Sequence, residues 1–87
     1  MKFENKQQLI AAIRKDIIGE LEAIIQYTAH LNATDEPLAK AVWTQIRDEE
    51  RVHVGELLTL LTYYEPSEIE TLAAGEKEVK EIMETIR

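Results

Sequence analysis

The sequence predicts an all-α protein: an antiparallel hairpin of two long helices followed by a C-terminal helix, with two hairpins pairing into a four-helix bundle. Three glycines and two prolines are spread thinly over 87 residues, so few positions can end a helix. Apolar residues recur at alternating steps of three and four, the spacing of a buried helical stripe, and never alternate with polar residues over a strand's length. We therefore expect one domain, residues 1–87, with helices at 5–31, 36–63 and 67–86.

Local signals support these helix ends. Asn5 followed three residues later by Gln8 is typical of a helix start. The segment 32–37, Asn-Ala-Thr-Asp-Glu-Pro, supplies capping side chains and then a proline, which a helix accepts in its first turn. Ser67 with Glu70 predicts a capping box at the start of the third helix.

The third helix carries apolar residues along one side. We expect that side to dock on the hairpin or on a neighbouring subunit. Gly75 lies inside this helix and predicts a kink or an interruption, because glycine costs about 1 kcal/mol there relative to alanine. The apolar positions are Ile69, Leu72, Val79, Ile82, Met83 and Ile86.

Composition excludes several classes of function. The chain has no cysteine, so it forms no disulfides and has no thiolate chemistry. Its 17 acidic and 10 basic residues give a formal net charge of -7, which disfavours binding to nucleic acid and to anionic membranes. No apolar run reaches the roughly 20 residues that cross a bilayer, and the N-terminus lacks a signal-peptide core. We expect an unexported, cytoplasmic protein that oligomerises, because so short a chain buries little surface alone.

Three polar residues interrupt the two apolar stripes of the hairpin. Glu20 interrupts the first, and Glu50 and His53, three apart on one helix face, interrupt the second. Antiparallel helices bring together residues equally distant from the turn near Thr34 and Asp35, so Glu20 and Glu50 meet at one level. The first stripe is Ile10, Ile13, Ile17, Glu20, Ile24, Tyr27 and Leu31, and the second is Ala39, Trp43, Ile46, Glu50, His53, Leu57, Leu60 and Tyr64.

This polar layer predicts a metal site. Ionised carboxylates in an apolar layer cost several kcal/mol unless they are paired or bound to metal, and no Lys or Arg lies on either stripe. A divalent cation fits, and the oxygen and nitrogen donors suit iron, manganese or zinc. One hairpin offers too few ligands, whereas a two-fold homodimer gathers four carboxylates and two histidines, the set of dinuclear carboxylate proteins. The alternative is a hydrogen-bonded polar layer that specifies helix pairing.

Other polar and aromatic residues lie near this layer. Tyr27, two turns from the first glutamate, either packs in the core or supports a ligand. Glu22 and Glu49 lie off the stripes and are either solvated charges or an outer cation site. We expect Trp43 in the core and His30 at the surface.

A pattern in the two long helices resembles the encapsulated ferritins and their half-ferritin relatives. It covers residues 16–60 and consists of Gly19-Glu20-Leu21-Glu22-Ala23, Tyr27, Thr34-Asp35 with Pro37, and Arg47-Asp48-Glu49-Glu50-Arg51-Val52-His53. The resemblance implies a ferritin-like fold in which two chains build one ferroxidase centre and dimers form a ring-shaped decamer. It further implies that Glu20, Glu50 and His53 bind iron, that Tyr27 is a close neighbour and that Glu22 belongs to an outer iron site.

The sequence departs from this family at three points. Some members carry a glutamate directly ahead of the first ligand, where this chain has Gly19, and an aromatic residue before the tyrosine, where it has Gln26. Members packaged in encapsulin shells bear a C-terminal docking extension, and this sequence stops at Arg87 without one. An encapsulin nanocompartment is thus the partner that the family implies, with no docking tail in the sequence.

These observations predict a ferroxidase that oxidises Fe(II) to Fe(III) at a dinuclear carboxylate and histidine centre, in iron storage or mineralisation. The centre holds two Fe per dimer interface, with Mn or Zn as substitutes. One alternative is a non-enzymatic helical scaffold or structural metal-binding module. Another is peroxide reduction of the rubrerythrin type, which would need a separate reductase because the chain has no cysteine for a rubredoxin-like site.

Overall fold

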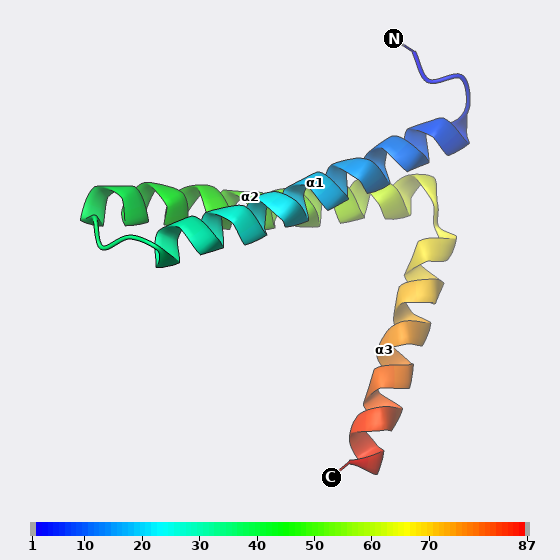
Figure 1. Cartoon of the computed structure of the whole chain (residues 1–87). Helices are drawn as coiled ribbons and strands as arrows, with labels where there is room; N and C mark the ends of the chain where they lie inside the picture. Colours follow the sequence, from blue (N-terminus) through cyan, green and yellow to red (C-terminus); the bar gives the residue numbers. More distant parts are fainter. Residues whose placement is uncertain (1, 87) are drawn as a thin grey trace.

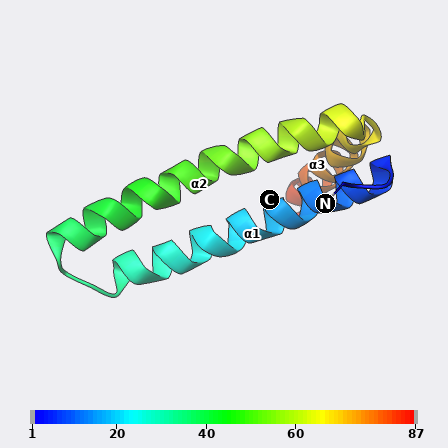
Figure 2. The same cartoon turned by 90° about the horizontal axis from the view of Figure 1, so that it is seen from above.

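The computed structural model describes residues 2–86 and contains three helices, α1 (Lys6–Asn32), α2 (Pro37–Tyr64) and α3 (Ser67–Thr85). Helices α1 and α2 lie side by side as an antiparallel hairpin, and α3 leaves the end of α2 at a steep angle (Figure 1, Figure 2). The described residues contain no strand, which confirms the all-α prediction. Each helix end lies within one residue of its predicted position.

Helix α1 begins as its sequence predicts. The Asn5 side chain accepts a hydrogen bond from the Gln8 backbone N–H at 2.9 Å, and so satisfies one of the donors that a helix start leaves free. The Gln8 side chain reaches back and accepts from the Glu4 N–H at 2.8 Å. These reciprocal bonds fix the direction in which the chain enters α1.

Helix α2 begins with Pro37 in its first turn, as expected, after a short turn in which Thr34 Oγ1 accepts from the Glu36 N–H at 3.1 Å. The capping box predicted for α3 is wrong. Pro66 precedes α3 with helical torsions (φ -59°, ψ -25°), so Ser67 already lies inside the helix and lacks the extended backbone of a capping residue. Its hydroxyl instead donates to Glu65 Oε1 at 2.6 Å.

The core lies at the open end of the hairpin, away from the α1–α2 turn. Ile10, Ile13 and Leu61 are buried there, and Leu61, at 2% exposed, replaces Leu60, the predicted stripe residue, which is 42% exposed. Apolar residues spaced by alternating steps of three and four repeat every 3.5 residues on average. A straight α-helix has 3.6 residues per turn, so such a stripe drifts slowly around the helix. By the end of α2 this drift has moved the buried line by one residue. The residues packed around this core are Leu9, Ile17 and Tyr64.

Helix α3 stays exposed along its length. It buries no residue, so the expectation that it docks on its own hairpin is wrong, and the alternative, docking on a neighbouring subunit, stays a prediction. The helix continues through Gly75 without a break. The chain is consequently thin and extended, 51 × 45 × 14 Å. Its radius of gyration is 17.2 Å, against about 12 Å for a compact protein of this length. Within residues 2–86 no helix is both long and apolar enough to cross a membrane.

Candidate metal centre

Glu20, Glu50 and His53 converge near the middle of the hairpin. Each side chain offers one ligand atom, and these atoms all lie within 4.8 Å of one another. His53 Nδ1 is 3.6 Å from Glu20 Oε2 and 3.7 Å from Glu50 Oε2. Glu50 and His53 are three apart on α2 and therefore share a face, while Glu20 approaches from α1. The structure brings together the three residues that the sequence predicts as metal ligands.

One oxygen of Glu20 has no hydrogen-bond partner among the described residues, although His53 Nδ1 lies 3.6 Å from it. Glu20 Oε2 is buried and accepts no hydrogen bond, although the side chain as a whole is 25% exposed. A buried carboxylate oxygen without a hydrogen bond lowers the stability of the fold by on the order of a few kcal/mol, more than a neutral polar group in the same position. A cation bound between the three residues would satisfy this oxygen.

The spacing of the three atoms suits a small metal ion. Ligands at about 2.0–2.2 Å in a tetrahedral site lie roughly 3.3–3.6 Å from one another. The two distances from His53 Nδ1, 3.6 and 3.7 Å, lie at the upper limit of this range and just above it. A small closing movement of the side chains would therefore complete the coordination.

Among the described residues, no arginine pairs with either carboxylate of the cluster. Arg47 and Arg51 both pair with Asp48 on the outer side of α2, at 3.1 and 3.7 Å. Arg14 pairs with Glu68 instead. An imidazole carries at most one positive charge, so His53 alone cannot offset both Glu20 and Glu50.

The cluster lies at an open surface of the hairpin. The His53 side chain is 46% exposed, and those of Glu20 and Glu50 are 25% and 19% exposed. Three protein ligands leave coordination positions open on any metal ion. This face can therefore accept further ligands from outside the chain.

The remaining aromatic candidates lie on the loop side of the cluster. Tyr27 is half-buried on α1, and its ring meets that of His30 edge-on, with centroids 6.3 Å apart. His30 also contacts Trp43 across the hairpin, with ring centroids 5.2 Å apart. His30 is exposed, as expected, but it also links the two helices. The spacing of residues along α1 could not predict the contact between His30 and Trp43, because Trp43 lies on the other helix of the hairpin.

Glu22 and Glu49 lie outside the three-residue cluster. Both are exposed, and Glu49 Oε1 accepts a hydrogen bond from Gln45 Nε2 at 3.2 Å, within α2. The outer cation site to which these two residues were assigned stays a prediction.

Two curated proteins are similar to this chain. A ferritin-like and encapsulin shell fusion protein of Pyrococcus furiosus is 32% identical over 77 residues, which are 88% of this chain and 22% of that protein. The encapsulin nanocompartment cargo protein EncC of Myxococcus xanthus is 39% identical over 74 residues, 85% of this chain and 54% of that protein. The chain thus spans less than two thirds of either relative. No family model matches it.

A solved structure extends this similarity from sequence to fold. The crystal structure of the encapsulated ferritin domain from Pyrococcus furiosus matches with a TM-score of 0.89 and 32% identity, covering 93% of this chain and 83% of that one. Nearly the whole length of both chains therefore shares one arrangement of helices. This chain belongs to the encapsulated ferritin family.

Proposed function

We propose that the protein is a ferroxidase, which binds two Fe(II) ions at a dinuclear centre shared by two copies of the chain and oxidises them to Fe(III). The observation that carries the proposal is the buried Glu20 Oε2, which accepts no hydrogen bond from the described residues and lies 3.6 Å from His53 Nδ1 within a three-residue candidate ligand cluster. Membership of the encapsulated ferritin family supports iron as the metal. The oxygen and nitrogen donors also accept Mn or Zn.

A second copy completes the ligand set. Two hairpins related by a two-fold axis supply Glu20, Glu50 and His53 twice, as the four-helix bundles of dinuclear carboxylate proteins do. The chain exposes 7053 Å², which exceeds by about 1,800 Å² the surface expected for a compact protein of its 10.0 kDa. A standard interface covers about 800 Å² on each partner. The excess supports the homodimer and a further contact that builds a larger ring, such as a decamer.

In the proposed reaction, the carboxylates favour iron oxidation by compensating the positive charge of the ions. The four carboxylates offset the charge of two Fe(II) ions and stabilise Fe(III) more strongly, which favours loss of an electron from each. Dioxygen accepts these two electrons with two protons and leaves as hydrogen peroxide; where peroxide is the oxidant, the two electrons and two protons give water. His53 would supply a nitrogen ligand to one of the two ions, and Tyr27 lies on the same face of α1 as Glu20. Glu22 and Glu49 would attract incoming Fe(II) by charge alone.

The proposed setting is the interior of an encapsulin nanocompartment in the cytoplasm. The two relatives are described as an encapsulin shell fusion and an encapsulin cargo protein. A single chain only 14 Å thick along its shortest axis encloses no space for mineral. A surrounding shell would provide the storage volume.

Iron oxidation by purified protein tests the proposal. Chelator-treated protein receives Fe(II) in air, and Fe(III) formation is followed by absorbance for wild type, Glu50→Gln and His53→Ala. Glu56→Gln is the matched control, because Glu56 is exposed on the same helix and lies outside the cluster. We expect both cluster variants to lose most of the activity and the control to keep it.

Anaerobic titration separates binding from oxidation. Calorimetry with Fe(II) should show two ions per dimer for wild type and for Glu56→Gln, and no comparable binding for Glu50→Gln. Equal oxidation rates in all variants would refute the proposed centre. Binding without oxidation by air or peroxide would leave a structural metal module, the non-enzymatic alternative.

A further inference from the structure

Helix α3 has few attachments to the hairpin. Of its residues, only Glu68 in the first turn is partly buried, and every other described position is exposed. Its backbone neighbours on α2 lie at the junction, and Figure 1 shows its C-terminal end far from the hairpin. Within one chain, whatever fixes the angle of α3 must therefore act near its first turn.

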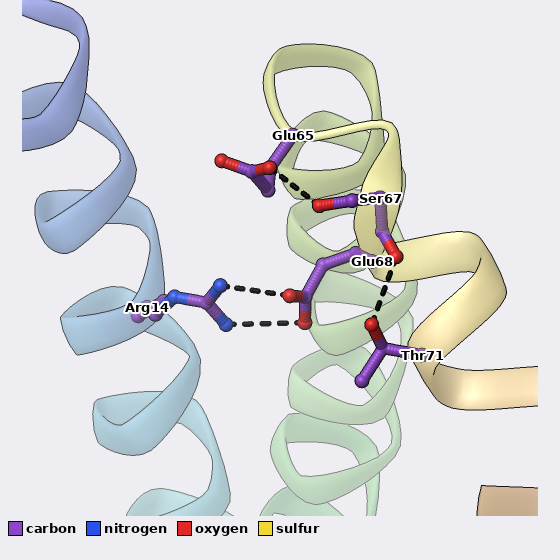
Figure 3. A network of polar contacts seen from close by, with 5 residues as sticks. All are labelled: Arg14, Glu65, Ser67, Glu68 and Thr71. Carbon is purple, nitrogen blue, oxygen red and sulfur yellow. Dashed lines mark hydrogen bonds and ion pairs between the residues drawn. The ribbon is translucent and has the colours of Figure 1, made fainter. Parts of the chain in front are cut away.

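An ion pair between α1 and α3 lies at this point. Arg14 donates two parallel hydrogen bonds to Glu68, from one guanidinium nitrogen to Oε2 at 3.1 Å and from the other to Oε1 at 2.8 Å (Figure 3). Bidentate arginine and carboxylate pairs fix orientation as well as distance. The other ion pairs that join two described residues lie within α2, within α3 or at the His53 cluster.

The pair lines one part of an open apolar depression beside the core. This depression measures about 300 Å³, and its apolar lining is Ile17, Ile18, Leu58 and Leu61, with Arg14 and Glu68 completing it. An arginine can lay its methylene stem on such a surface while its charged end stays hydrated. The Arg14 side chain is 46% exposed and that of Glu68 only 18%. The carboxylate is thus the more enclosed partner.

Between α2 and α3, the backbone torsions of a single residue set the direction in which α3 leaves the hairpin. Pro66 is already helical, and its ring fixes φ. Glu65, at φ -130° and ψ 77°, is where the chain leaves the helical conformation. Rotation about Glu65 would swing α3 as a rigid arm, and the Arg14–Glu68 pair spans that pivot from the side of α1.

We propose that the Arg14–Glu68 pair is a latch that fixes the angle between α3 and the hairpin, and that opening it lets α3 swing about Glu65. The charges are suited to this role. The hydrogen bonds from Arg14 lower the pKa of the Glu68 carboxyl, and Glu68, with a contribution from the charge of Glu65, raises the pKa of Arg14. Both partners therefore stay ionised around neutral pH. Arg14 and Glu68 lie outside the candidate metal cluster, so the latch is tested on metal-free protein.

Distance measurements between two spin labels test the latch. Because the sequence has no cysteine, Gln26→Cys on α1 and Glu81→Cys on α3, both exposed, take the labels selectively. Dilution with unlabelled chain restricts the pulsed electron paramagnetic resonance signal to distances within one chain. We expect a narrow distribution in the otherwise unchanged protein.

Three substitutions and salt then separate the explanations. Arg14→Gln should replace the narrow peak by a broad distribution of distances. Arg14→Lys should give an intermediate width, because lysine lacks the bidentate geometry of arginine. Arg51→Gln removes the same charge from an ion pair within one helix and should leave the distribution unchanged. About 1 M salt should broaden the unsubstituted distribution, since the Debye length falls to about 3 Å. This salt arm remains informative if Arg14→Gln does not fold. If the distance distribution stays narrow in high salt, and also in Arg14→Gln when that variant folds, the latch is overturned. The angle of α3 would then be set by the backbone of the turn.

Discussion

Replacing Glu20 by glutamine should stabilise the metal-free protein while it removes metal binding. Glutamine keeps nearly the shape of glutamate and removes its charge. In the metal-free protein, the ligand atoms of Glu20 and Glu50 lie within 4.8 Å of each other. Among residues 2–86, no arginine pairs with either carboxylate, and Glu20 Oε2 accepts no hydrogen bond. The substitution therefore relieves a repulsion that only a bound cation would otherwise offset.

The spacing of the cluster sets the size of the effect. The ligand atoms lie within 4.8 Å of one another, and two like charges at that distance repel by about 3.5 kcal/mol at an effective dielectric constant of about 20 and by about 0.9 kcal/mol in bulk water. The side chains of Glu20 and Glu50 are 25% and 19% exposed, so screening is intermediate. We expect a gain of about 1–3 kcal/mol in the free energy of unfolding.

Urea denaturation of chelator-treated protein at pH 8 and one fixed concentration measures this gain. Glu22→Gln is the matched control, because it removes the same charge from an exposed position of α1 and should change stability little. Adding Fe(II) anaerobically should stabilise wild type by mass action and leave Glu20→Gln unchanged. A Glu20→Gln protein less stable than wild type without metal would refute the reasoning, since Glu20 would then have a compensating partner.

Two further predictions concern the core and the latch. Leu61→Ala should lower the free energy of unfolding by about 2–5 kcal/mol. Leu60→Ala, at an exposed position, should lower it by clearly less. Equal losses in urea denaturation would contradict the assignment of the core. Because the folded pKa of Glu68 lies below its ordinary value of 4.5, the pair stabilises the fold above that pH and loses this contribution as pH falls through the lowered pKa. Arg14→Gln should flatten this part of an acid titration followed by circular dichroism, and an unchanged titration would contradict it.

Much of the hairpin and its candidate site could be predicted because both depend on spacing along a helix. Glu50 and His53 share a face whatever the tertiary structure, and a short turn forces Glu20 to their level. The replacement of Leu60 by Leu61 shows where spacing becomes insufficient. A drift of one residue accumulates over a long helix, and only packing against α1 decides which leucine is buried.

The arrangement of α3 could not be predicted in the same way. Its direction depends on the torsions of Glu65 and on a contact between Arg14 and Glu68, which are 54 positions apart in the chain. Nothing in the periodicity of α1 or α3 specifies that pairing. The false capping box at Ser67 has a related cause, because a helical Pro66 shifts the start of the helix by one residue.

The open ligand set has a consequence for when the protein can act. One chain provides three candidate ligands, so on the proposal above each centre exists only where two chains have met. Well below the dissociation constant of the dimer, the number of centres then rises with the square of the chain concentration. Iron oxidation would start only when chains are gathered together, and a chain diffusing alone would have no complete centre with which to release oxidants.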